Sequence, residues 1–344
     1  MPFDLLGAVL STATFFGIYA LLSLSLNFQY GITGLPNFGL VLFYGIGAFA
    51  SGVISATALT WVATGRASPY CNVLAGGPRM GLAASDPALA IGVFLLGIIV
   101  AGIVAGLFGY ILSYPAIRIE EEWYLALVLL IAAEIVRVVA RNYDGFGSIC
   151  GFNGLGGIPG PFQWLPSVTG QSIAFALVGL ALVATAYLYF ERELNSPYGR
   201  MLKSIRDDHI AARSLGKNVG RVRIQVMIIG SVFAGIAGGL FTYYSNYVSP
   251  DNFVSIVTFN VWVMIVLGGL GNNKGALLGT LIVISLQKIT SVLAITLPIP
   301  NASLELNYST YIIEGVIFLL LLMYRPQGLV PEKSVKTPAE IALV

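Results

Sequence analysis

NSPYGRMLKSIRDDHIAARSLGKNVGRVRIQ, residues 195–225, is a charged segment that separates two long apolar runs. Only 10% of the 344 residues are charged, whereas 57% are hydrophobic. Soluble domains carry roughly 25% charged residues, so the composition excludes that class. A helix needs about 20 apolar residues to cross a hydrocarbon core, and the runs on both sides are that long. The segment therefore lies outside a membrane, between two spans of an all-α, polytopic integral membrane protein.

The apolar runs predict about nine transmembrane helices, with a range of eight to ten. The range arises because the second run is rich in glycine and forms either one broken helix or two short ones. The predicted domain is a single transmembrane unit over 1–330, followed by a tail over 331–344. The predicted spans are 5–28, 37–63, 88–112, 122–141, 171–190, 224–248, 253–271, 275–297 and 308–324.

The distribution of Lys and Arg predicts the orientation, because short cytoplasmic loops are rich in both residues. The loop 191–223 contains eight of them, so we place this loop in the cytoplasm. Alternation of the spans puts Arg118, Lys274 and the basic tail on the same side. The opposite loops contain only Arg66 and Arg79. The sequence thus predicts a multi-pass plasma-membrane protein with its N-terminus outside and its C-terminus in the cytoplasm.

Several function classes are excluded by charge and composition. A net charge of +2 gives no electrostatic support for binding nucleic acid. Two cysteines are too few for a zinc cluster, and we expect no metal site. The one histidine, His209, lies in the charged loop, so the spans contain no Ser-His pair and no HExxH motif. No G-x-x-x-x-G-K-[ST] loop is present, so this chain is not expected to hydrolyse ATP.

The two cysteines both fall in predicted outer loops, on the oxidising side of the membrane. Cys71 lies in 64–87 and Cys150 in 142–170. They form either a disulfide or two free thiols. Both loops are rich in glycine and proline and are predicted to lack regular secondary structure.

The charged segment itself contains one amphipathic helix by periodicity. Gly216 is predicted to end this helix, as glycine commonly does at a C-terminus. Such a helix lies either on lipid headgroups or against a cytoplasmic partner protein, and we favour the partner. The helix is predicted over 202–216 because five residues recur at steps of three and four, namely Leu202, Ile205, His209, Ala212 and Leu215.

The motif IAARSLG, residues 210–216, resembles the E-A-A-x-x-x-G signature of ABC importer membrane subunits, with Ile210 in place of the acidic residue. Further motifs resemble the LivM-like branch of the branched-chain amino acid permeases, and they follow one another from residue 24 to residue 330. These are LSLNFQYGITGLPNFG (24–39), GIGAF (45–49), WYLALVLLIAAEIVRVVARN (123–142), GLGGIPGP (154–161), LGGLGNNKGALLG (267–279) and YRPQGLV (324–330).

The resemblance implies a permease subunit of an ABC importer, which forms the translocation path for branched-chain amino acids. It implies three kinds of partner: a homologous second permease, cytoplasmic ATPase subunits that bind ATP and Mg, and an extracellular substrate-binding protein. This chain would itself hold no cofactor. Related permeases for urea or short amides share these motifs and give the alternative substrate. The residues expected to couple to the ATPase are Leu202, Ile205, Arg206, His209, Ala211, Ala212, Leu215 and Gly216.

Four charged residues fall in the interior of predicted spans, away from their ends, and near mid-bilayer a charge costs about 2.5–3.5 kcal/mol on insertion scales. Glu134 and Arg137 are three residues apart on one helix face and can pair locally. Lys288 and Glu314 lie on neighbouring spans and are candidates for a pair between them. Structural pairing is the favoured interpretation. The alternative is a proton or ion relay, as in an ion-coupled secondary transporter.

Two glycine-rich segments, 31–39 and 267–275, separate adjacent predicted spans. Backbone groups freed at a helix break are tolerated in a membrane only where they face protein or a water-filled cavity. The segments are therefore either linings of a gate or pathway, or ordinary turns. The pathway or gate candidates are Gly31, Gly34, Asn37, Gly39, Asn260, Gly268, Gly269 and Gly271.

Overall fold

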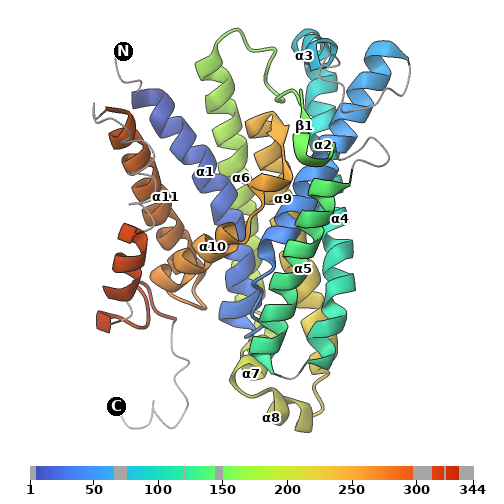
Figure 1. Cartoon of the computed structure of the whole chain (residues 1–344). Coiled ribbons are helices and arrows are strands. Elements are labelled where there is room, and N and C mark those ends of the chain that lie inside the picture. Colours follow the sequence, from blue (N-terminus) through green and yellow to red (C-terminus); the bar gives the residue numbers. More distant parts are fainter. Residues whose placement is uncertain are drawn as a thin grey trace.

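The structure is a computed structural model that describes residues 5–65, 76–119, 121–143, 150–296, 312–320 and 323–332. Within these residues, eight helices are long and apolar enough to cross a membrane. Figure 1 shows how they are arranged. They are α1 (Leu5–Leu26, continued by the π-helix η1, Asn27–Ile32), α2 (Leu40–Thr64), α4 (Pro87–Arg118), α5 (Glu122–Asn142), α6 (Val168–Asn195), α9 (Val219–Ser245), α10 (Ser255–Gly268) and α11 (Asn273–Thr296).

The eight helices correspond to the first eight predicted spans and confirm an all-α, polytopic membrane protein. The glycine-rich second span is one continuous helix, α2, so the expectation of a possible break there is wrong. The ninth predicted span, 308–324, is described only in part, and residues 312–320 of it are helical.

Small residues bring three helices, α2, α4 and α9, into the most extensive packing of the bundle. A Cβ added at Gly238 of α9 would overlap the carbonyl oxygen of Tyr44 in α2. One turn earlier in α9, a Cβ added at Gly235 would overlap Ala105 of α4. Helices in a membrane associate through such close van der Waals contact, because lipid removes the hydrophobic drive between them. The three helices therefore form a tightly fitted unit.

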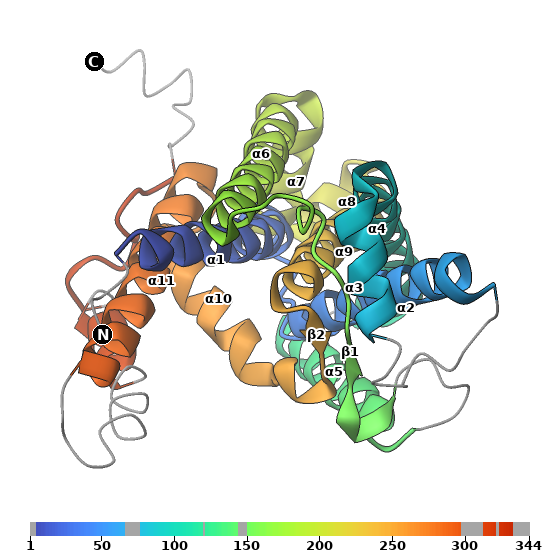
Figure 2. The same ribbon diagram turned by 90° about the horizontal axis from the view of Figure 1, so that it is seen from above.

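Helices α6, α10 and α11 are arranged around α1, which also packs against α9, whereas α5 packs against α2 and α4. Figure 2 shows α10 running obliquely from α11 toward α5. Helix α10 alone has only 14 residues and covers about 21 Å at 1.5 Å per residue, so it is long enough to cross a membrane only together with the residues that precede it, as the 19-residue span Pro250–Gly268. The backbone groups that a short helix leaves unpaired within a membrane must be satisfied by other parts of the protein.

One end of the bundle carries a short two-stranded sheet and a helix that the sequence does not predict. Strand β1 (Leu155–Gly156) pairs antiparallel with β2 (Tyr247–Val248). Helix α3 (Gly76–Ser85) lies in the loop predicted to be irregular, so that prediction is wrong. Arg79 of α3 is fully buried and donates from Nε to Thr60 at 2.7 Å and from Nη1 to the carbonyl of Gly156 at 3.4 Å.

These bonds fix α3 against α2 and the sheet, which overrides the Gly-Pro composition of the segment. Desolvation lowers the pKa of Arg79 from its ordinary value. The buried guanidinium is the reason that α3 forms where glycine and proline indicate a loop.

The opposite end of the bundle carries the charged segment, folded as α7 (Pro197–Asp207) and α8 (His209–Ser214). Helix α1 begins at the other end, away from α7 and α8 (Figure 1). Arg223 of α9, which is 8% exposed, donates from Nη1 to the carbonyls of Ala116 and Ile119. These carbonyls belong to the end of α4, where the helix leaves acceptors unpaired.

Close packing at Gly238 predicts a stability difference between two identical substitutions. Gly238→Ala is expected to lower the thermal unfolding temperature in detergent, because overpacking typically costs about 1–3 kcal/mol. Gly92→Ala in α4 is the matched control, since nothing lies within 4 Å of a Cβ at that position. It should leave the temperature unchanged or raise it, because alanine favours helix more than glycine does. Equal effects of the two substitutions would show that the α2–α9 contact is loose.

Candidate functional site

The charged segment forms two helices, so the prediction of one helix over 202–216 is wrong. Asp208 separates them, with an extended backbone at φ −157° and ψ 103°. Its carboxylate accepts from the N–H groups of Ile210 at 2.8 Å and Ala211 at 2.9 Å, which begins α8 as an N-cap. These two hydrogen bonds hold the pKa of Asp208 below its ordinary value, and the bond from Ala211 has the larger effect.

The end of α8 agrees with the sequence. Gly216 adopts the left-handed conformation at φ +77°. Its N–H donates to Arg213, and the N–H of Lys217 donates to Ala212 at 3.1 Å. This pair of bonds is the Schellman arrangement, which satisfies the last carbonyls of a helix.

The break at Asp208 divides the predicted docking face into a buried part and an exposed part. Leu202 and Ile205 of α7 and Ala212 of α8 are buried against the rest of this chain. They are therefore not available to a partner. Two apolar side chains are exposed instead, Ile210 at 66% and Leu215 at 80%. The other expected coupling residues are His209, which is half-buried, and Ala211, which is exposed.

The first glycine-rich segment is a real helix break. Chain direction changes after η1, and α2 begins only at Leu40. Gly34 has a φ of +76° and lies against Arg206, which leaves little room for a side chain. Asn37 holds the turn through its side chain, which accepts from the N–H of Gly39 at 2.9 Å and donates to Gln29 at 2.9 Å.

The second glycine-rich segment breaks the chain between α10 and α11. Gly269 and Gly271 both have positive φ, +120° and +76°. The carbonyls at the end of α10 are satisfied by a returning segment of the chain. Leu329 donates from its N–H to the carbonyl of Leu267 at 3.0 Å, and Val330 donates to that of Gly268 at 2.9 Å.

The two breaks touch one another through an asparagine that joins them. Asn27 of η1 accepts from the N–H of Gly271 at 2.9 Å and donates to the side chain of Asn273 at 3.1 Å. Asn273 in turn donates to Glu191 of α6 at 3.1 Å. A Cβ at Gly31 would lie 2.5 Å from the N atom of Gly271, so only glycine permits this approach.

Helix α7 is bonded to both breaks through one arginine. Arg206 donates from Nη1 to the carbonyl of Gly31 at 2.6 Å and to Oε2 of Glu332 at 2.8 Å. The other oxygen of Glu332 lies 2.7 Å from Nζ of Lys203. Glu332 follows the segment that pairs with Leu267 and Gly268, and Asn272 donates to Pro331 at 3.1 Å. Residues assigned from the sequence to the tail thus belong to this junction, which we call the α7 clamp (Asn27, Gly31, Lys203, Arg206, Gly271, Asn273 and Glu332).

The sequence predicted functional positions for some members of the α7 clamp but not for others. Arg206, Gly31 and Gly271 were expected at functional positions, but in two unconnected groups. Asn27, Asn273, Lys203 and Glu332 were not expected. Asn260 is half-buried on α10 and makes no contact with the α7 clamp that the structure records.

The intramembrane pair Glu134–Arg137 forms, with Arg137 Nη2 lying 2.8 Å from Glu134 Oε2. Arg137 and Arg141 also lie 3.5 Å and 3.6 Å from Oδ1 of Asp251, which follows α9. Ser255 donates to the second carboxylate oxygen of Glu134. The charges balance one another, and they attach α5 to the connection between α9 and α10.

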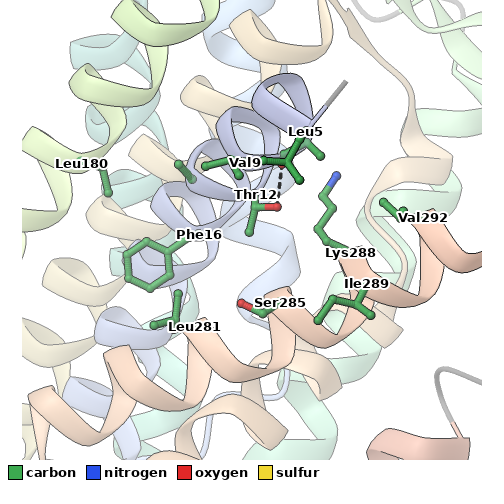
Figure 3. Close-up of a pocket in the computed structure, with 12 residues that line it drawn as sticks. Leu5, Val9, Thr12, Phe16, Leu180, Leu281, Ser285, Lys288, Ile289 and Val292 are labelled. Atoms are coloured by element: carbon green, nitrogen blue, oxygen red, sulfur yellow. Dashed lines mark hydrogen bonds between the residues drawn. The ribbon is translucent and has the colours of Figure 1, made fainter. Parts of the chain in front are cut away.

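The proposed pair between Lys288 and Glu314 does not form among the described residues. Lys288 instead lies with Nζ 4.1 Å from the centre of the Phe15 ring. Figure 3 shows its side chain in a cavity of about 650 Å³ between α1, α6 and α11, whose walls are largely apolar. Glu314 is 5% exposed, and its Oε1 is buried without a hydrogen-bond partner among the described residues. Cys71 lies outside the described residues, so its disulfide with Cys150 stays a prediction.

Comparison with known proteins identifies the family. The family described as branched-chain amino acid transport system / permease component matches residues 8–322. The chain belongs to this family. With eight helices able to span a membrane, this permease-family protein is a multi-pass protein of the cell membrane.

The relatives of this chain include permeases described as LivM and permeases described as LivH. A probable branched-chain amino acid transport permease protein LivM of Methanocaldococcus jannaschii is 33% identical, over 98% of this chain and 96% of that one. The high-affinity branched-chain amino acid transport system permease protein LivM of Escherichia coli is 27% identical, over 96% of this chain and 72% of its own length. The corresponding LivH of Escherichia coli is 24% identical over 92% of both chains. No solved structure matches significantly.

The α7 clamp predicts energetic coupling between Arg206 and Glu332. Arg206→Gln and Glu332→Gln should each lower thermal stability, and the double variant should lose less than the sum of the two. The expected coupling is about 1 kcal/mol, because both side chains are about a quarter exposed and solvent weakens the pair. Hydrogen exchange at the N–H groups of Leu329 and Val330 should quicken in each variant.

Arg200→Gln is the control for loss of a positive charge on α7, since Arg200 is exposed. This variant should change neither the stability nor the exchange. Strictly additive effects of Arg206→Gln and Glu332→Gln would show that the two side chains act independently.

Proposed function

We propose that this chain is the membrane-spanning permease subunit of an ATP-driven importer for branched-chain amino acids. Its partners would be a homologous second permease, separate ATPase subunits and an extracellular binding protein. The relatives named above are permeases for branched-chain amino acids by description, which supports this substrate over urea or short amides. The presence of both LivM and LivH among them supports a paired permease.

The observation that carries the proposal is the position of Arg206. An importer powered by a separate subunit needs a mechanical connection from a surface helix to the parts of the membrane domain that open and close. Arg206 lies on α7 and bonds directly to the carbonyl of Gly31 at the first break. Through Glu332 it also reaches the segment that pairs with the end of α10. A push on α7 and α8 would therefore move both breaks together.

The exposed side of α8 is the surface proposed to receive the push. Leu215 and Ile210 are large apolar side chains that face outward at the end of the bundle with α7 and α8. Leu215 is 80% exposed, and burying a leucine side chain in a partner contributes about 1.5–3 kcal/mol. The absence of a phosphate-binding loop from the sequence is the reason to place ATP hydrolysis on another chain.

An ion-coupled mechanism is less well supported by the charged residues. Both oxygens of Glu134 have partners, Arg137 and Ser255, which favours a structural role. A relay carboxylate would need access to water and a changing protonation state. The Glu134–Arg137 pair instead attaches α5 to the connection that contains Asp251.

The proposal is tested by co-purification from gently solubilised native membranes. A P-loop ATPase should be recovered with the tagged full-length chain and lost from Leu215→Asp, because a charge in an apolar contact opposes burial. Substrate uptake by Leu215→Asp should fall below a tenth of the wild-type rate. The amount of chain in the membrane should stay the same, since Leu215 makes little contact with the rest of the permease.

Ser204→Asp is the control, because it adds the same charge at an exposed position of α7. It should retain both the ATPase and uptake. Two results would contradict the proposal: recovery of the chain without any P-loop ATPase, or normal ATPase recovery with Leu215→Asp. Leu215 is a better test position than Ala212, because a large residue at buried Ala212 would disturb the fold itself.

A further inference from the structure

A cavity of about 670 Å³ opens beside the first helix break, at the end of the bundle with α7 and α8. Its walls come from four places in the chain: η1 and the break, the start of α5, the start of α8, and α10. The volume lies within the range of small-molecule sites, about 300–1,000 Å³. Neither the Glu134–Arg137 pair nor the α7 clamp accounts for this cavity.

Aromatic rings from three of these segments form one wall. The ring of Trp262 contacts that of Tyr30, with ring centres 4.5 Å apart, and stacks on that of Phe38, with ring centres 4.7 Å apart. Trp123 at the start of α5 also lines the cavity and is 64% exposed. The faces of such rings carry negative potential and attract a cation, and tryptophan does so most strongly.

A carboxylate lines the same cavity. Glu121 directly precedes α5, and its side chain does not cap that helix. The structure records no ion pair or hydrogen bond for this carboxylate among the described residues. A carboxylate together with aromatic faces is suited to an ammonium group, which has three N–H donors and a positive charge. The cavity also contains apolar contacts for a short side chain, from Pro36 and Ala126.

The aromatic wall contains a polar group that the present packing leaves unsatisfied. The indole N–H of Trp262 is buried and has no acceptor in the described part of the chain. Buried donors are rarely left without a partner. The wall is therefore expected to change its packing when the neighbouring break moves, which would give the N–H a partner.

We propose that this cavity binds a primary ammonium compound with a short apolar side chain, such as a branched-chain amino acid. Glu121 and the aromatic rings hold the ammonium group, while Pro36 and Ala126 contact the side chain. The identity of the ligand as an amino acid rests on the proposed function. The site itself rests on the cavity, its rings and its carboxylate.

The cavity also favours recognition of the amine over the carboxylate of an amino acid. Its one charged lining residue is acidic, and its rings present negative faces. A molecule with only a carboxylate should therefore bind poorly.

The test is calorimetric titration of the detergent-solubilised full-length chain with three related compounds. L-leucine and 3-methylbutan-1-amine, which lacks the carboxylate, should both bind saturably. 4-Methylpentanoate, which lacks the amine, should bind at least tenfold more weakly. Glu121→Gln should weaken binding of leucine and the amine at least tenfold, because the variant loses the negative charge while keeping the size of the side chain.

Glu193→Gln is the control, since Glu193 belongs to the end of α6 and does not line the cavity. It should bind as the wild type does. Trp123→Ala offers a second variant at an exposed position and should also weaken binding. Three results would overturn the proposal: no saturable binding of leucine or the amine, equal binding of the acid, or unchanged binding in Glu121→Gln. The titration needs no ATPase, so its failure is distinct from failure of the co-purification that tests the proposed function.

Discussion

The contact of Arg206 with the carbonyl of Gly31 and with Glu332 holds together parts of the chain that lie far apart in sequence. Charge-assisted hydrogen bonds of this kind are shorter and stronger than neutral ones. They also constrain direction, because a guanidinium donates along fixed lines. Since Arg206 is carried by α7, the position of that helix fixes the position of two breaks. Gly31 must be glycine for this geometry, because a side chain would separate the breaks.

Helix breaks can exist here because other parts of the protein form hydrogen bonds with the backbone groups that the breaks leave unpaired. The carbonyls of Leu267 and Gly268 receive the N–H groups of Leu329 and Val330, and the N–H of Gly271 reaches the side chain of Asn27. Such replacement is what a membrane interior requires of irregular backbone. The unit of α2, α4 and α9 differs, because its helices are continuous and pack through glycine. The molecule thus combines a tightly fitted unit with broken elements that the α7 clamp holds.

The sequence was a good guide wherever one local property decided the structure. Length of apolar run gave the eight described spans, and the three-residue spacing of Glu134 and Arg137 gave their pair. One local signal was missed: the pattern over 202–216 fits one helix, yet the side chain of Asp208 caps and begins a second one. The other failures arose where distant contacts decide the structure. Arg79 gives α3 a structure that its glycines oppose. Glu332 carries no local signal, since its partners are on α7.

The first helix break, between η1 and α2, contacts both α7 and the cavity beside α10, and different residues of the break make the two contacts. Gly31 and Gly34 face Arg206 of α7. Tyr30, Pro36 and Phe38 line the cavity beside α10. A ligand bound to the rings and a force applied to α7 therefore act on the same short stretch of backbone. If movement of α7 shifts this stretch, the affinity of the cavity for its ligand changes as well, and by linkage a bound ligand acts on α7 to the same extent. The same geometry that transmits a push toward the membrane would transmit the presence of a ligand back to α8.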